Sequence, residues 1–224
     1  ETVFNGYLMD ICGLIATRKD SKRVKNKSTR KFGSSNLSII KINQALKIKK
    51  FKNIYFSSDI PELNKYASKK GLILIKRPKK YLGKCTISDL APFLVKNIKE
   101  NHICYLMTTS PLIKYKTLQK AVNIYEKLNF SKYDSLNTFE IVKDFLWGKN
   151  KPINYKLEKQ PMSQNLGGVF KHIPAISIMS KKKIIKFRNV LGKKPYKMFL
   201  KKPESFDIDT IYDFNISVHY YKKK

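Results

Sequence analysis

The chain has 224 residues and a mass of 26.1 kDa, which is enough for one α/β domain with a sizeable core. Apolar residues make up 42% of it and aromatic residues 12%, so the composition excludes a disordered or low-complexity protein. Lys and Arg total 47 against 16 Asp and Glu, and the formal charge of +31 is typical of a protein with a polyanionic partner.

Short apolar runs alternate with segments of helical period in the first half of the chain. We expect strands over residues 11–17, 54–56, 72–75 and 102–107, and helices over residues 37–48, 61–70, 88–99 and 117–128. Strands that alternate with helices are typical of a parallel sheet covered by helices on both faces. The sequence therefore predicts an α/β fold with a Rossmann-like, mostly parallel sheet.

The alternation stops beyond about residue 134. Residues 140–172 have no clear period and contain the only Trp, Trp147. We interpret this stretch as an arm inserted into a single domain that spans residues 1–224. Further strands are expected over residues 173–179 and 196–200, followed by a closing helix over residues 210–221.

The cysteines show neither disulfide nor metal-site spacing. Cys12, Cys85 and Cys104 lie far apart beside apolar runs, which favours buried free thiols and a reducing compartment. No apolar run approaches the length of a membrane span, and no secretory signal is recognisable. We expect a soluble, cytoplasmic protein.

The first predicted strand leads into a basic segment over residues 18–30. Ligands bind beyond the carboxyl ends of strands in an open parallel sheet, and four Lys and three Arg at this place suit a triphosphate. Three of the five Arg in the chain are Arg18, Arg23 and Arg30, and a fourth, Arg77, follows another strand. In a chain that otherwise uses Lys, Arg at these positions indicates bidentate, charge-assisted hydrogen bonds. A solvated basic turn is the alternative interpretation.

Acidic residues are scarce, yet Asp207, Asp209 and Asp213 lie within one short segment. In an extended backbone Asp207 and Asp209 point to the same side. Mg²⁺ binds through one or two carboxylates together with phosphate oxygens and water, so this pair is the candidate Mg²⁺ site. The alternative is that Asp209 caps the closing helix and Asp207 pairs with a Lys.

Four segments, in this order, resemble the acylneuraminate cytidylyltransferase (CMP-sialic acid synthetase) family and its CMP-Kdo synthetase relatives. T-R-K-D-S-K-R-V-K-N-K-S at residues 17–28 is similar to the family's A-R-x-x-S-K-x-x-x-x-K-N. R-P at residues 77–78, followed by C-T-I-S-D at residues 85–89, is similar to its R-P and D-T-A-S-S segments. T-S-P-L at residues 109–112 and S-x-D-I-D-T at residues 205–210 match without change. The resemblance covers nearly the whole chain after about residue 10 and implies a fold of the nucleotide-diphospho-sugar transferase type.

The resemblance implies a nucleotidyltransferase that transfers CMP from CTP to the anomeric hydroxyl of a nonulosonic, sialic-acid-like sugar and releases pyrophosphate. Arg18, Lys22 and Lys27 would hold the triphosphate and offset the charge that develops in the transition state. Asp207 and Asp209 would hold Mg²⁺, which makes the sugar hydroxyl more acidic, and Arg18, Lys27 and Asp209 would be the catalytic residues. The remaining residues expected to bind substrate are Ser21, Ser28, Arg77, Thr86, Ser88, Thr109, Ser110 and Gln164.

The resemblance also implies that residues 140–172 form a dimerisation arm, which completes the sugar pocket of the partner in a homodimer. Several family positions differ here: Met107 and Ile113 replace a Gln and an Arg, Ser28 replaces an Asn, and Ile173-Pro174 replaces an N-G pair. These changes cluster on the sugar and base sides, so they predict an altered sugar, weaker base selectivity or a catalytically impaired nucleotide-binding homologue.

A basic nucleic-acid-binding protein is a third hypothesis, suggested by the charge of +31. Readers of nucleic acids favour Arg, and this chain has few Arg residues and no recognisable nucleic-acid-binding motif. The excess of Lys is therefore better explained as solvated surface.

Overall fold

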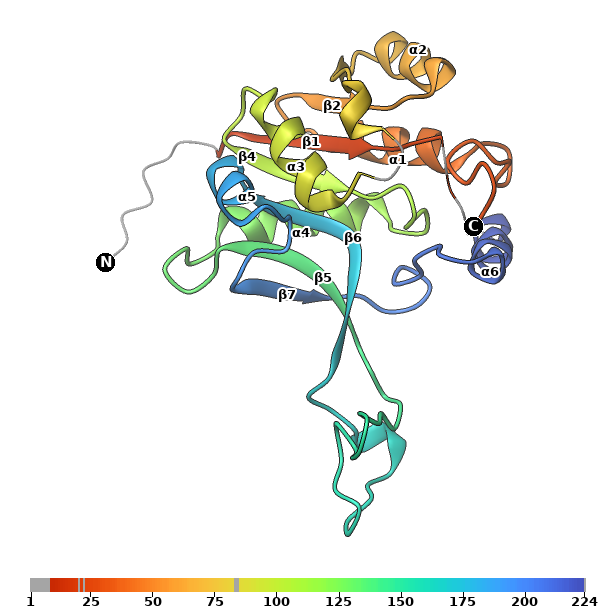
Figure 1. Ribbon diagram of the computed structural model, residues 1–224, viewed down its shortest axis with the longest axis vertical. Helices are drawn as coiled ribbons and strands as arrows, with labels where there is room; N and C mark the ends of the chain where they lie inside the picture. The colour runs from red at the N-terminus through yellow and green to blue at the C-terminus, as the bar shows by residue number, and fades with distance from the viewer. Residues whose placement is uncertain (1–8, 20, 22, 83–84, 224) are drawn as a thin grey trace.

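The computed structural model describes residues 9–19, 21, 23–82 and 85–223. Its centre is a seven-stranded sheet of order β3-β2-β1-β4-β6-β5-β7 (Figure 1). The strands are β1 (Ile11–Ala16), β2 (Ile54–Ser57), β3 (Ile73–Leu74), β4 (His102–Leu106), β5 (Ser135–Ile141), β6 (Phe170–Ser180) and β7 (Pro195–Phe199). β6 is antiparallel to both of its neighbours, and the other pairs are parallel. The predicted α/β class with a mostly parallel sheet is confirmed.

Helices cover both faces of the sheet. They are α1 (Leu37–Ala45), α2 (Pro61–Lys69), α3 (Ile87–Lys96), α4 (Tyr115–Glu126), α5 (Lys181–Phe187) and α6 (Ile211–Lys222), with short 3₁₀ turns η1 (Lys79–Tyr81) and η2 (Ser163–Asn165). Alternate residues of β1 show the two faces: Ile11 and Ile15 pack in a core with α1, α2 and α4, whereas Cys12 and Leu14 pack with α3 and α5. None of the helices in the described part of the chain is long and apolar enough to cross a membrane.

A third, smaller core lies apart from these two and is called the edge cluster here. Its buried members come from both ends of the described chain and are Val24, Phe32, Leu37, Ile40, Ile208 and Phe214. The rings of Phe32 and Phe214 meet edge to face with centroids 5.4 Å apart, a favourable aromatic geometry. The edge cluster therefore ties the segment after β1 to the segment before α6.

The start of α6 corrects one interpretation of the sequence. The N-cap is Thr210, whose side chain accepts a hydrogen bond from the Asp213 backbone N–H, while the Asp213 carboxylate accepts one from the Thr210 backbone N–H. This is a capping box, which satisfies two donors at the helix start. Asp209 therefore does not cap the closing helix, and its carboxylate remains available to other groups.

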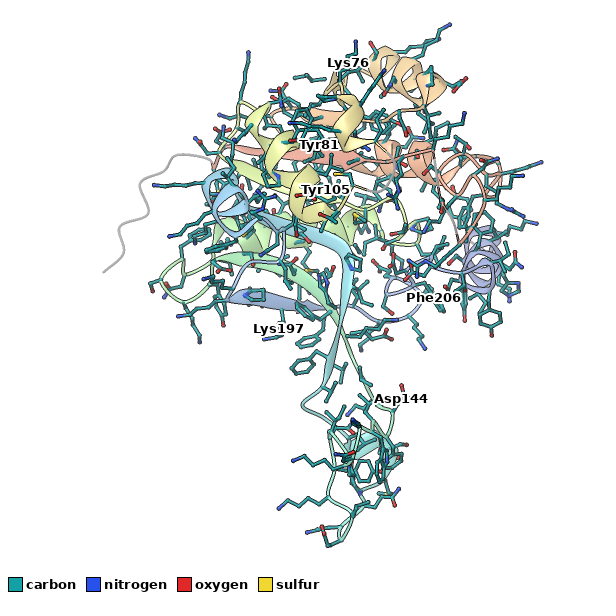
Figure 2. The ribbon with its side chains drawn as sticks, viewed as in Figure 1. Lys76, Tyr81, Tyr105, Asp144, Lys197 and Phe206 are labelled. Atoms are coloured by element: carbon teal, nitrogen blue, oxygen red, sulfur yellow. The ribbon has the colours of Figure 1, made fainter. Side chains whose placement is uncertain are left out.

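The segment between β5 and β6 projects from the sheet as a long arm (Figure 1). β5 runs parallel to its neighbour β7 and antiparallel to β6, so the chain leaves and re-enters the sheet at the edge where the parallel strands end. The predicted irregular stretch was too wide at both sides, because β5 extends to Ile141 and β6 begins at Phe170. Asp144 marks the arm in Figure 2.

The cysteines are all free thiols in the structure. Cys12 and Cys104 are buried, as expected, whereas Cys85 is only partly buried. Burial raises the pKa of both buried thiols far above the usual value, so neither is a reactive thiolate.

Candidate active site

The parallel strands end at one edge of the sheet, and the predicted site residues follow several of these ends. The segment after β1 and helix α6 lie together beyond this edge, on the right in Figure 1. Phe206, just before the acidic pair, is labelled there in Figure 2, and its ring lies 5.5 Å from that of Tyr220 in α6. Ligands of open parallel sheets bind at such an edge.

The basic segment after β1 is held in a defined conformation by buried hydroxyl groups. Thr17 Oγ1 donates to Ser28 Oγ at 2.6 Å, and Ser28 Oγ donates to the Arg18 carbonyl at 3.0 Å. Ser38 Oγ, from α1, donates to the Ser28 carbonyl at 3.1 Å. Ser28, predicted to bind substrate, is thus buried and already engaged in bracing the loop that carries Arg18.

The edge cluster brings the acidic segment against this loop. Val24 and Ile208 are both buried in it, at 1% and 0% exposure. Their neighbours Arg23 and Asp209 consequently form an ion pair, with Arg23 Nη2 2.7 Å from Asp209 Oδ1. Lys27 Nζ donates to the Ile208 carbonyl at 2.7 Å. Two segments far apart in the sequence therefore lie in contact, and the first carries cations while the second carries carboxylates.

The turn after β4 completes this arrangement. The Ile208 backbone N–H donates to the Thr109 carbonyl at 2.9 Å, and Ser110 Oγ donates to Asp207 Oδ1 at 3.3 Å. Ser110 is fully buried, so its hydroxyl holds Asp207 in place. Asp207 and Asp209 are both partly exposed on either side of the buried Ile208, which is the expected placement of alternate residues in extended backbone.

Lys27 is a cation whose pKa is influenced by both carboxylates. Its burial lowers the pKa of its ammonium group, and the charges of Asp209 and Asp207 counteract this by favouring the protonated form. Arg23 and Arg18 act in the same direction as burial. Lys27 therefore sits between the acidic pair and the other cations of the loop.

Arg77 lies at the ends of β2 and β3 and is 8% exposed. Its Nε donates to Ser57 Oγ at 2.9 Å and its Nη2 to the Ser57 carbonyl at 2.6 Å. Burial lowers the pKa of Arg77, and the neighbouring Asp59 favours its charged form. This fixed guanidinium is near enough to Arg18 for their charges to interact.

Three further residues predicted to bind substrate lie at the start of α3 or in the basic segment. Thr86 is the N-cap of α3, where its hydroxyl accepts from the Asp89 N–H at 3.3 Å and donates to the Asp89 carboxylate at 2.6 Å. Ser88 is exposed in the first turn of α3, and Ser21 is partly buried in the basic segment. Lys22 lies outside the described residues.

Gln164 is not brought to the strand ends by its own chain. It belongs to η2 on the arm, where its side chain is exposed and donates to Met162 Sδ at 3.7 Å. Because the arm projects from the sheet (Figure 1), Gln164 belongs to a different part of the molecule from the acidic pair.

The acidic pair fits a particular kind of metal site. Among the described residues, no three His, Cys, Asp or Glu side chains form a group that could hold a metal ion. Asp207 and Asp209 alone are a sufficient protein contribution for Mg²⁺, which keeps water and substrate phosphate oxygens as its other ligands. Two carboxylates beside Arg23 and Lys27, whose positive charges attract phosphate, suit that chemistry and do not suit a metal enclosed by protein.

A cavity of about 720 Å³ lies beside α3 and η1, and Cys85 in its wall is near enough to Arg18 and Arg77 for their charges to interact. Tyr81 and Phe93 stack in its wall with ring centroids 4.3 Å apart, and Arg188 also lines it. Among the described residues that line it, none is a predicted site residue. The candidate active site is therefore an open surface at the strand ends, where the cations and carboxylates converge, and not this cavity.

Lys41 and Gln44 of α1 support the site and were not predicted from the sequence. Lys41 is fully buried, and its Nζ donates to the Ser110 carbonyl at 2.9 Å. Gln44 Nε2 donates to the carbonyls of Pro111 and Ile113, both at 2.8 Å. A signal was available, because Lys41 lies four residues after Leu37 and interrupts the apolar face of the helix.

Comparison with known proteins identifies one protein family for this chain. A family model described as cytidylyltransferase matches residues 12–216. No curated protein sequence matches the chain.

Three solved structures share the fold. CMP:2-keto-3-deoxy-manno-octonic acid synthetase, in complex with CTP, has a TM-score of 0.68 at 9% identity over 95% of this chain and 98% of its own. The 4-diphosphocytidyl-2C-methyl-D-erythritol synthase of Anaerococcus prevotii has a TM-score of 0.69 at 12% identity over 96% of each chain. A cytidylyltransferase of Leptospira borgpetersenii has a TM-score of 0.59 at 15% identity over 96% of this chain and 94% of its own.

Proposed function

The chain belongs to the cytidylyltransferase family and is a nucleotidyltransferase, and we propose that it transfers CMP from CTP to the anomeric hydroxyl of a nonulosonic, sialic-acid-like sugar. The observation that carries the proposal is the meeting of the basic loop with the acidic segment, joined by Lys27 Nζ and the Ile208 carbonyl at 2.7 Å. The proposal assigns phosphate binding to the cations of the loop and metal binding to the carboxylates of the acidic segment, which lie side by side.

In the proposed reaction the sugar hydroxyl oxygen attacks the α-phosphorus of CTP. The bond from the α-phosphorus to the bridging oxygen breaks, pyrophosphate leaves, and the hydroxyl proton passes to solvent. Arg18 and Lys27 would bind the triphosphate and offset the negative charge that grows on the leaving pyrophosphate. Arg77, held by Ser57, would contact the nucleotide from the ends of β2 and β3.

Asp207 and Asp209 would hold Mg²⁺, and the buried hydroxyl of Ser110 keeps Asp207 oriented for this role. Bound there, the ion would supply Lewis-acid chemistry that makes the attacking hydroxyl more acidic. Ile208 anchors the segment that carries the two carboxylates, since its side chain is fully buried in the edge cluster.

The proposal includes a homodimer in which the arm, predicted over residues 140–172, contributes Gln164 to the sugar pocket of the partner. Large apolar side chains are exposed on the arm, among them Trp147, Ile153 and Met162, and a surface of this kind is typical of a protein interface. The free thiols favour a reducing compartment, so we place the reaction in the cytoplasm.

The second candidate is a nucleotide-binding protein without catalysis. The observation in its favour is Ile113, which occupies the position of a family Arg and is 1% exposed within the main core. A cationic side chain at that position has been replaced by core packing, while the loop cations and the acidic pair are retained.

The test is pyrophosphate release from CTP and Mg²⁺ with a panel of acceptors. The panel contains sialic-acid-type sugars together with the octonic acid and methylerythritol acceptors for which the neighbouring structures are named. We expect turnover with a nonulosonic sugar, and Asp209→Ala should abolish it while the thermal unfolding midpoint stays close to that of the wild type. Turnover only with another acceptor would contradict the sugar assignment. CTP binding without turnover on any acceptor would establish the second candidate.

A further inference from the structure

Asp209 has two competing partners if the proposed function holds. In the structure its Oδ1 is 2.7 Å from Arg23 Nη2, and the two side chains are 48% and 65% exposed. The proposed function, however, requires the same carboxylate to bind a divalent cation. The guanidinium and a bound divalent cation are both positive and repel each other at this distance, so the metal weakens the Arg23–Asp209 pair.

We propose that Arg23 is a further nucleotide-binding residue, which pairs with Asp209 in the empty site and moves to the triphosphate when Asp209 binds the metal. This inference rests on the proposed function and extends it to a residue that the family motif does not include. Arg23 would thus keep the acidic pair neutralised before substrate arrives, and would add a charge-assisted contact afterwards.

The surroundings of Arg23 make this exchange feasible. Both partners are about half exposed, and exposed ion pairs are weak enough for a bound cation to displace them. The backbone beside Arg23 stays fixed during the exchange, because Val24 is buried in the edge cluster. Only the side chain needs to move.

The other cations of the loop are less suited to the same role. Lys27 is half-buried, and its Nζ already donates a hydrogen bond to the Ile208 carbonyl. Arg18 is exposed beyond β1 and is near enough to Lys27 and Arg77 for their charges to interact. Arg23 is the guanidinium that the structure places directly on a predicted metal ligand.

The exchange predicts opposite effects of one substitution on two ligands. Mn²⁺ serves as the metal probe, measured by electron paramagnetic resonance without nucleotide. Arg23→Gln should tighten Mn²⁺ binding by about two- to fivefold, the range of an exposed ion pair. The same variant should weaken binding of CTP in the presence of Mg²⁺ by roughly tenfold or more, because a charge-assisted hydrogen bond to phosphate is lost.

The matched control is Lys31→Gln, which removes one positive charge from an exposed position just after the basic segment. It should change either affinity by less than about twofold, since exposed charges at a distance are screened by salt. Equal effects of the two variants would overturn the proposal. They would show that the loss of any one positive charge changes the two affinities, whatever its position. Weaker or unchanged Mn²⁺ binding in Arg23→Gln would overturn it as well.

A further pair of variants separates this inference from the proposed function. If Asp207→Asn and Asp209→Asn both leave Mn²⁺ affinity at the wild-type value, the metal site itself is wrong and the proposed function fails with it. If these two variants weaken Mn²⁺ binding but Arg23→Gln does not tighten it, the metal site stands and the exchange of Arg23 alone is refuted.

Discussion

Ile208→Ala tests whether the edge cluster holds the acidic pair against the basic loop. The substitution removes three carbon atoms from a side chain that is 0% exposed. At about 0.8 kcal/mol for each buried methylene-sized group, the transfer contribution is about 2.4 kcal/mol. The cavity left among Val24, Phe32 and Phe214 adds to this, so we expect the free energy of unfolding to fall by about 3–4 kcal/mol.

Urea unfolding followed by circular dichroism measures this loss, with two companion variants. Ile208→Val removes one carbon and should cost about 1 kcal/mol. Ile211→Ala, three residues further on at a 45% exposed position, should change the free energy of unfolding by no more than about 0.5 kcal/mol. If Ile208→Ala costs no more than Ile211→Ala, the edge cluster does not anchor the acidic segment, and our account of the site is wrong.

Three further predictions concern the cations. Arg18→Lys keeps the charge but loses the planar fork, so kcat/KM for CTP should fall by roughly tenfold or more; a wild-type value would contradict a bidentate role. Lys41→Met removes the hydrogen bond to the Ser110 carbonyl, and the turn after β4 should shift. Because the turn positions the site, kcat should fall by roughly 10- to 100-fold in steady-state assays. An unchanged kcat would make Lys41 a purely structural residue. Because burial lowers the pKa of Lys27, CTP affinity should fall as the pH rises towards 10.5, and Lys27→Arg should abolish that fall. The stability contribution of Lys27 should rise over the same range, since the unfolded chain there binds more protons than the folded one; stability that falls instead would refute the assigned cause.

The sequence predicted those parts of the fold in which apolar pattern and burial agree. The strand at β1 is a continuous apolar run, and α2 begins at Pro61 and ends before Gly71, which has a φ of +81°. These two features depend on local signals, which a single sequence contains. The convergence of Asp207 and Asp209 with the basic loop is not local and was implied by the family resemblance.

β5 was missed because its buried positions are polar. Ser135, Asn137 and Thr138 are all 0% exposed, yet none belongs to an apolar pattern. They form hydrogen bonds across the fold: Asn137 Nδ2 donates to the Leu191 carbonyl at 2.8 Å, and Thr138 Oγ1 donates to the Ile173 carbonyl at 2.6 Å, whereas Asn137 Oδ1 is buried without a hydrogen-bond partner. Burial of such groups depends on partners that the local sequence does not reveal.

α5 was missed for the opposite reason. It begins with three consecutive Lys residues, which indicated a solvated surface, and Ile184 is its one buried residue in the structure. Lys41 was not assigned, and Arg23 was assigned charge-assisted bonds without its partner, because both contacts involve distant groups, the Ser110 carbonyl and the Asp209 carboxylate. Charged side chains acquire their function from tertiary neighbours, and no local period marks them.

The partners in the Arg23–Asp209 contact are 186 positions apart in the sequence. A chain that grows from the ribosome therefore makes its cationic loop long before the carboxylates that face it. Until residue 209 has left the exit tunnel and α6 has docked, the loop exposes its charge alone. The site is thus completed only after the strands from β1 to β7 have all been made, since β7 ends at Phe199.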